Sequence, residues 1–199
     1  METKIIKVKV TLEEEMLGTA NANPEIHEEF IASKAPDAPS REEEIAALGV
    51  EAVVEKGRTI FPKLEDGTPF LWDYQIKGFF KDACGMLRRV PDSKSKGLAA
   101  YAKVIDGLIF PEPRKIPIHV NGEIGECQRP LRAQTMQGER VTLANSETVP
   151  AGSWFAFDIK LLNPAHEAVV REWLDYMTMR GFGQWRNSGK GRATWEEIT

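Results

Sequence analysis

The stretch GFGQWRNSGKGRATW, from Gly181 to Trp195, contains four glycines and three basic residues and no acidic residue. Gly181 stands where a C′ glycine commonly ends a helix. The residues RATWEEI, which begin at Arg192, are typical of a short strand. The stretch therefore predicts a loop that joins a helix to a final strand.

Before this loop the sequence predicts a strand and then a helix. Asn163, followed by Pro164 and Glu167, supplies a cap, a first-turn proline and a first-turn acid for the helix. In the strand, every second residue is apolar: Phe155, Phe157, Ile159 and Leu161. In the helix, one face is formed by His166, Val169, Val170, Trp173, Leu174 and Met177.

The N-terminal part repeats this order. Residues 3–12 alternate, which predicts a half-buried strand whose solvent side is basic through Lys7 and Lys9. A hairpin is expected in FPKLEDGTPFLW, and Asp73 begins a helix that runs to about Arg89. Residues 104–150 are rich in Pro and Gly with short strand-like pieces, which favours hairpins and loops over a second packed unit.

The resulting order is strand, helix, two strands, helix, strand. This is the ferredoxin-like (RRM-like) plan, an α+β fold with an antiparallel sheet and both helices on one face. The 199 residues suit a single domain, residues 1–199, with a partly helical acidic insertion at about 18–58. Ser40, with Glu43 three residues on, predicts a capping-box helix start within that insertion.

The net charge of −4 conceals an uneven distribution. Residues 13–55 hold twelve acidic residues against Lys34 and Arg41, a local charge of −10, so the rest of the chain carries +6. No apolar run is long enough for a membrane span and the N-terminus does not resemble a secretion signal, so we expect a cytoplasmic protein. The only cysteines, Cys84 and Cys127, have no zinc or disulfide spacing.

The glycine-rich loop allows two interpretations. Its glycines would let a phosphate backbone approach bare N–H groups, while Trp185 offers a surface for an unstacked base. Alternatively, the glycines form only a tight turn and Trp185 packs inward as an anchor. The basic residues available to an RNA ligand are Arg180, Arg186, Lys190 and Arg192.

The loop resembles the C-terminal glycine-rich loop of the RAMP superfamily, the ferredoxin-like RNA-binding subunits and guide-processing nucleases of CRISPR complexes. The shared pattern G-x-G-x-x-R-x-x-G-x-G falls on Gly181, Gly183, Arg186, Gly189 and Gly191. The segments VTLEEEMLGTA (10–20) and LWDYQIKGFFKDAC (71–84) are also similar to that family. The resemblance implies that these loop residues contact RNA backbone and that Lys77, at the helix start, faces the same groove. The acidic 18–58 insertion departs from the family, whose guide-binding members are usually basic.

Our leading hypothesis is a non-catalytic RAMP-like protein that binds single-stranded RNA, or docks on a ribonucleoprotein complex, through the loop at 180–192 and the basic face of its sheet. It predicts salt-sensitive binding that is lost when Arg186, Lys190 and Arg192 become alanine. The alternative is a protein-interaction module that captures a protein partner through residues 18–58. Such a module could be a viral inhibitor of a nucleic-acid-handling complex.

A third hypothesis is a metal-independent endoribonuclease. Such cleavage needs an acid and a base, and the candidate among the histidines is His119, on an expected strand near Arg114 and Lys115. We expect no metal site and no cofactor, because the acidic runs Glu13–Glu15 and Glu42–Glu44 lack ligand spacing and no phosphate-loop or nucleophile motif is present.

Overall fold

The computed structural model describes residues 2–21, 58–135 and 138–199. Its main sheet has the strand order β11-β1-β10-β7-β5, and β6 pairs with β10 beside β7. The strands are β1 (Lys4–Leu12), β5 (Phe70–Trp72), β6 (Ile109–Glu112), β7 (Lys115–His119), β10 (Trp154–Leu161) and β11 (Ala193–Glu197). All pairs in this sheet are antiparallel.

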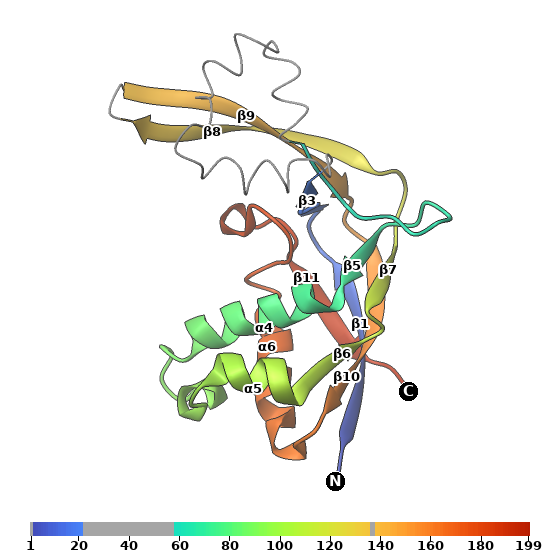
Figure 1. Ribbon diagram of the computed structural model, residues 1–199, viewed down its shortest axis with the longest axis vertical. Helices are drawn as coiled ribbons and strands as arrows, with labels where there is room; N and C mark the ends of the chain where they lie inside the picture. The colour runs from blue at the N-terminus through green and yellow to red at the C-terminus, as the bar shows by residue number, and fades with distance from the viewer. Residues whose placement is uncertain (1, 22–57, 136–137) are drawn as a thin grey trace, which may run out of the picture.

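The helices lie together on one side of this sheet (Figure 1). They are α4 (Asp73–Leu87), α5 (Tyr101–Leu108) and α6 (Glu167–Tyr176), with the short turns η1 (Lys94–Gly97), η2 (Pro164–His166) and η3 (Arg186–Ser188). The ferredoxin-like plan is formed, in chain order, by the strand β1, the helix α4, the strands β6 and β7, the strand β10, the helix α6 and the strand β11. The expected α+β fold is therefore confirmed.

The core fills the space between the sheet and the helices. Alternate residues of β1 and β10 are buried, and Phe80 of α4 meets Trp173 of α6 with ring centroids 5.5 Å apart. The buried side chains of the two strands are Ile6, Val8, Val10, Leu12, Phe155, Phe157, Ile159 and Leu161. The period-two pattern therefore placed both strands correctly, because one face of each is covered by helices.

A second sheet extends from the first. It consists of β2 (Met16–Leu17), β3 (Ala20–Asn21), β4 (Thr59–Ile60), β8 (Gly125–Thr135) and β9 (Gly138–Val149) in the order β2-β9-β4-β3, with β8 paired to β9. The hairpin of β8 and β9 is a long arm that projects at the top of Figure 1. It lies between β7 and β10 in the chain, where strand-like pieces were expected.

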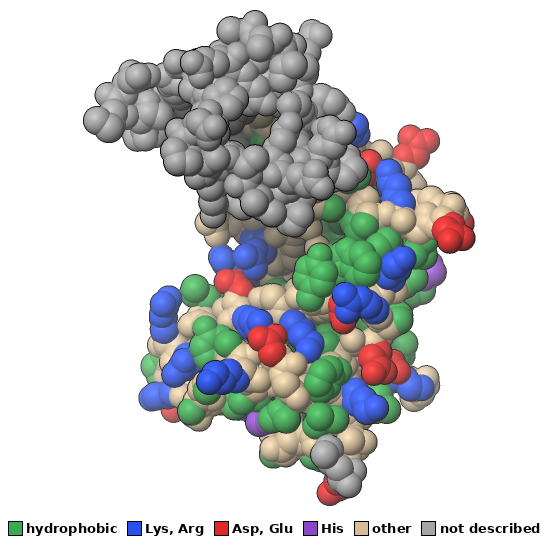
Figure 2. All heavy atoms as spheres, in the orientation of Figure 1, with side chains coloured by type: hydrophobic (Ala, Val, Ile, Leu, Met, Phe, Trp, Pro, Cys, Tyr) green, Lys and Arg blue, Asp and Glu red, His purple; other side chains and the backbone are tan. Residues whose placement is uncertain are grey.

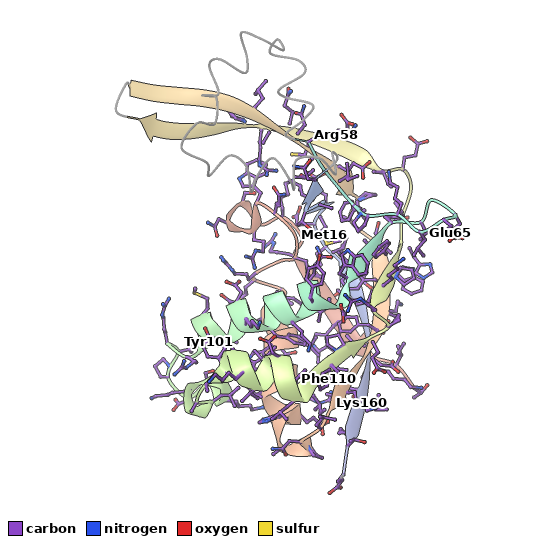
Figure 3. The ribbon with its side chains drawn as sticks, in the orientation of Figure 1. Met16, Arg58, Glu65, Tyr101, Phe110 and Lys160 are labelled. Carbon is purple, nitrogen blue, oxygen red and sulfur yellow. The ribbon has the colours of Figure 1, made fainter. Side chains whose placement is uncertain are left out.

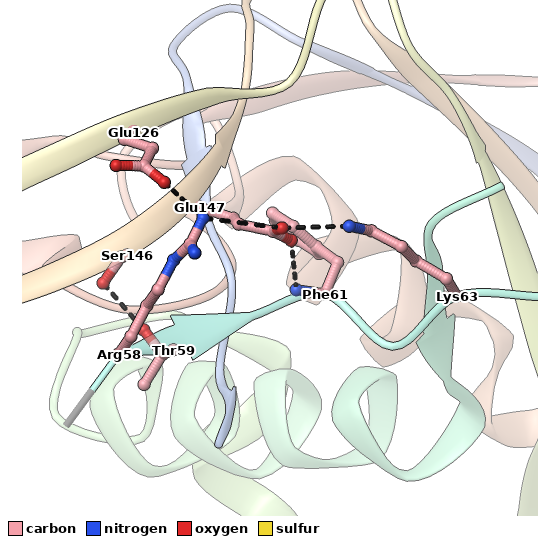
Figure 4. A network of polar contacts seen from close by, with 7 residues as sticks. All are labelled: Arg58, Thr59, Phe61, Lys63, Glu126, Ser146 and Glu147. Atoms are coloured by element: carbon pink, nitrogen blue, oxygen red, sulfur yellow. Dashed lines mark hydrogen bonds and ion pairs between the residues drawn. The ribbon is translucent and has the colours of Figure 1, made fainter. Parts of the chain in front are cut away.

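A buried carboxylate joins this second sheet to the segment at 58–63 (Figure 4). Glu147 of β9 accepts hydrogen bonds from Phe61 N at 3.1 Å and from Lys63 Nζ at 2.9 Å. Thr59 and Ser146 share a hydroxyl hydrogen bond of 2.7 Å beside it. These contacts place β4 next to β9, and they fix the wall of the cleft described below.

Two expectations from the sequence are corrected by the structure, and a third concerns residues that lie mostly outside the described ranges. Gly181 does not end α6, because that helix stops at Tyr176 and Gly181 is not in the left-handed region. Helix α5 lies where hairpins and loops were expected. Of the proposed acidic insertion at 18–58, residues 22–57 lie outside the described residues.

Candidate nucleic-acid interface

The glycine-rich loop, residues 180–192, is anchored by Phe182. This ring is 4% exposed and lies 4.4 Å from the ring of Phe79 in α4 and 5.7 Å from that of Phe155 in β10. Trp185 is instead 43% exposed. The inward anchor that the second interpretation assigned to Trp185 is therefore Phe182, and Trp185 faces outward.

Two glycines allow the ends of the loop to cross at close range. Phe182 N donates to Gly191 O at 2.9 Å, and Gly191 N donates to Glu15 O at 2.8 Å. A Cβ on Gly191, whose φ is +73°, would lie 2.1 Å from Phe182 O, and one on Gly181 would lie 2.2 Å from the carbonyl carbon of Gly191. Close backbone approach, and not helix termination, is thus the physical reason for Gly181.

Each of the four loop cations is paired with an acid. Arg180 Nε and Arg186 Nη1 both donate to Asp82 Oδ2, at 2.6 and 2.9 Å, and the hydrogen bond to Asp82 raises the pKa of Arg180. Lys190 pairs with Glu15, which raises its pKa, and Arg192 donates to Glu14 at 3.2 Å. The cations therefore carry much less unbalanced charge than the sequence indicates.

The outer turn of the loop presents unused backbone donors. Ser188 N and Gly189 N donate to Trp185 O and Arg186 O. Among the described residues, none of the N–H groups from Gly183 to Asn187 donates to a protein acceptor. Trp185 holds φ at +56°, an uncommon conformation for a large side chain. Such a run of amides forms a concavity that favours an anion.

Arg129 of β8 adds a cation next to this turn. It is 6% exposed, its Nη2 donates to Gln184 Oε1 at 2.6 Å, and its guanidinium carbon lies 5.5 Å from the Trp185 ring centroid. Within the described part of the chain no carboxylate pairs with it. A buried charge without a counter-charge is costly, so this arginine favours an external anion beside Gly183–Asn187.

A cleft of about 460 Å³ opens between the loop, the first turns of α4 and the β2–β3 segment. Trp72 and Tyr74 stack at 6.2 Å with planes 15° apart, and Tyr74 is 57% exposed. A hollow of about 410 Å³ lies beside it at residues 180 and 183–187 and shares Gly183 and Arg186. The cleft is lined by Thr19, Ala20, Pro62, Leu71, Trp72, Tyr74, Gln75, Gly78, Phe79, Phe182, Gly183 and Arg186.

The structure places Lys77 away from this cleft. Lys77 Nζ donates to Asp106 O at 3.0 Å and lies 4.4 Å from the ring centroid of Phe110, which is labelled in Figure 3. The expectation that Lys77 faces the same groove as the loop is therefore wrong. The first turns of α4 contribute Tyr74, Gln75 and Gly78 instead.

The open face of the main sheet has mixed charge. Lys9 donates to Glu196 Oε1 at 2.8 Å and Lys7 is opposite Asp158 in the strand register, so the face is less basic than expected. His119 is exposed and stacks on Trp154 with centroids 3.8 Å apart, while Lys9 lies 5.4 Å from that ring. Among described residues His119 has no hydrogen-bonding acid or base beside it, so the geometry supplies no pair for proton transfer.

Sequence reasoning missed several residues of this site. Tyr74 lies on a helix but off its buried face, which is a signal that could have singled it out. Arg129 and Gln184 are 55 residues apart in sequence, so no local pattern could have joined them.

In the described ranges no cluster of His, Cys, Asp and Glu is arranged for a metal ion. No helix among the described residues is long and apolar enough to cross a bilayer.

Comparison with known proteins supports the fold. No protein-family model matches the chain, and no curated protein matches it either. A chain of the cryo-EM structure of the Type III-B Cmr-β bound to cognate target RNA is similar, with a TM-score of 0.55 and 10% sequence identity. The match covers 100% of this chain and 60% of that chain, so this chain spans only part of its neighbour's length. At this identity the likeness is one of fold alone.

Proposed function

We propose that this chain is a non-catalytic, single-domain RAMP-like protein that binds single-stranded RNA as a component of a CRISPR-type ribonucleoprotein. The fold it shares with a chain of the RNA-bound Cmr-β supports this proposal. The RNA would lie in the cleft beside the glycine-rich loop, with bases on the aromatic rings and phosphates at the loop turn.

The observation that carries the proposal is the row of unused amides at Gly183–Asn187 together with two exposed rings. Tyr74 stands on one side, in the cleft, and Trp185 stands at the turn itself. A nucleic-acid strand offers phosphate oxygens to such donors and flat bases to such rings in regular succession. A small anion alone would not use the aromatic cleft.

The charge pairing around the loop decides which forces dominate. Because Arg180, Arg186, Lys190 and Arg192 already have acidic partners, the loop itself contributes little counterion release. Stacking and hydrogen bonding should therefore supply most of the affinity in the cleft. The alanine triple variant of Arg186, Lys190 and Arg192 would also strip Glu14 and Glu15 of their partners and leave Asp82 with Arg180 alone. A loss of binding in it would therefore not separate recognition from loop stability.

Tyr74→Ala is the sharper test. Base stacking on an aromatic ring contributes roughly 1–3 kcal/mol, so removal of this exposed ring should weaken binding of a labelled single-stranded RNA by about 5-fold to 150-fold. Tyr74→Phe keeps the ring and should bind as the unaltered protein does. Fluorescence anisotropy at fixed salt measures both, and thermal unfolding checks that the fold is unchanged.

Met179→Ala serves as the matched control, because Met179 is 74% exposed and does not line the cleft. It should leave RNA affinity unaltered. Equal affinities for Tyr74→Ala, Tyr74→Phe and the unaltered protein would contradict RNA binding in this cleft.

A further inference from the structure

Five cations without acidic partners gather at the far end of the helical layer. Arg88, Arg89, Lys94, Lys96 and Lys103 are all exposed, and in the described part of the chain none of them forms an ion pair. Asp92 is the only acid between residues 88 and 103. We name these five cations the basic end; Figure 2 shows Lys and Arg side chains gathered over this end of α4 and α5.

The basic end lies at the opposite end of α4 from the cleft. Tyr74 and Gln75 are in the first turn of this 15-residue helix, and Arg88 is its C-cap. At 1.5 Å per residue the two surfaces are about 20 Å apart along the helix axis. They are therefore separate surfaces on one rigid element.

Local structure keeps the cations of the basic end together. Lys94 and Lys96 belong to η1, whose Lys94 N and Ser95 N donate to the carboxylate of Glu172 in α6 at 2.8 and 3.0 Å. The Arg88 guanidinium carbon lies 5.3 Å from the ring centroid of Tyr101, at the start of α5. The cations thus come from three neighbouring elements that the core holds in place.

We infer that the basic end is a second RNA-binding surface, which contacts the phosphate backbone without reading bases. This inference rests on the proposed function in taking RNA as the ligand. Solvated lysines with no ion partner release counterions when they meet phosphates. Lysine is depleted in protein–protein interfaces, which depend on buried aromatic anchors, so this surface fits a nucleic-acid backbone better than an acidic protein.

The test is the quadruple variant Arg89→Gln, Lys94→Gln, Lys96→Gln and Lys103→Gln. Each phosphate contact on a single strand contributes about 0.7 to the slope of log K against log salt, so the slope should fall by about 2 to 3. Affinity for a 40-nucleotide unstructured RNA in 0.1 M salt should fall by at least ~20-fold. An unchanged slope would overturn the inference.

Two controls give the result its meaning. The double variant Lys94→Gln and Lys96→Gln should weaken RNA binding. The double variant Lys4→Gln and Lys160→Gln has the same change in net charge and should not weaken it. Equal effects of the two double variants would show a general charge effect and overturn the inference. Labelled poly-L-glutamate should bind far more weakly than the RNA, and equal binding would show a surface for acidic proteins.

The cleft is tested separately in the same assay. Tyr74→Ala should lower affinity with little change in slope, because it removes stacking and no charge. If only the Tyr74 variant is impaired, the inference fails and the proposed function stands. If only the quadruple variant is impaired, the cleft proposal fails and the basic end remains an RNA-binding surface.

Discussion

Gly191→Ala is expected to lower the free energy of unfolding by about 3 kcal/mol or more. A left-handed φ of +73° costs a non-glycine residue about 1–2 kcal/mol, and the added Cβ would stand 2.1 Å from the carbonyl oxygen of Phe182. Relief of that clash must separate the loop ends, which breaks the hydrogen bonds Phe182 N to Gly191 O and Gly191 N to Glu15 O. Urea unfolding at neutral pH measures the loss.

Two further glycine variants separate the causes. Gly189→Ala has a similar φ of +88° but its Cβ would meet nothing closer than 3.5 Å, so it should show the cost of strain alone. Gly107→Ala, in α5 with nothing within 4 Å of its Cβ, should stabilise the protein by about 0.5–1 kcal/mol. If Gly191→Ala lost no more stability than Gly189→Ala, the close crossing of the loop ends would be of no energetic importance.

Gly191→Ala also tests the role of the cleft in RNA binding. Phe182 and Gly183 line it, so displacement of the loop should weaken RNA binding together with stability. The glycines of the loop therefore serve function through geometry, by letting Phe182 anchor the turn that faces Trp185 outward.

Elements with strong periodicity were predictable from the sequence. β1, β10 and α6 each bury one face against the core. Their apolar residues therefore recur every two residues in the strands and about every 3.6 residues in the helix, which indicates the buried face. Helix α5 was not predictable in the same way, because its eight residues bury Ile105 and contain Gly107. A short helix with one buried anchor leaves little periodic signal.

The electrostatics of the site could not be predicted from local sequence. The partners of the loop cations, Asp82, Glu14 and Glu15, are between 98 and 178 residues away from them in the chain. The glycine-rich loop therefore appeared strongly basic in sequence. The sequence did not single out the cations at 88–103 as a binding surface, although the fold leaves them without acidic partners among the described residues.

Glu172→Ala is the second variant from which we expect a large effect. The Glu172 carboxylate accepts hydrogen bonds from Ser93 Oγ, Lys94 N, Ser95 N and Ser95 Oγ, at 2.6 to 3.0 Å. The buried Ser95 hydroxyl in turn accepts from Trp173 Nε1 at 2.9 Å. Loss of the charged acceptor should cost about 3 kcal/mol, because hydrogen bonds to charged groups contribute roughly 1.5–3 kcal/mol each.

Glu167→Ala is its matched control on the same helix. Glu167 forms an i,i+4 pair with Arg171 at 2.9 Å near the surface, and such pairs contribute less than about 1 kcal/mol. Urea unfolding at pH 7 compares the two variants. Equal losses would show that the hydrogen bonds around Ser95 add nothing beyond those of a surface ion pair.

The pH dependence of Glu172→Gln identifies the charge as the cause. Burial raises the pKa of Glu172, but hydrogen bonds from Ser95, Lys94 and Ser93 outweigh it and hold the pKa below its ordinary value. A group with a lowered folded pKa stabilises fully above its unfolded pKa, about 4.3 for glutamate, and its contribution is lost as pH falls through the folded value. The stability difference between the unaltered protein and Glu172→Gln should therefore be largest near pH 7 and shrink below about pH 4. A difference that stays constant from pH 7 to pH 3 would assign the loss to packing, because only an ionised carboxylate is titrated away over that range.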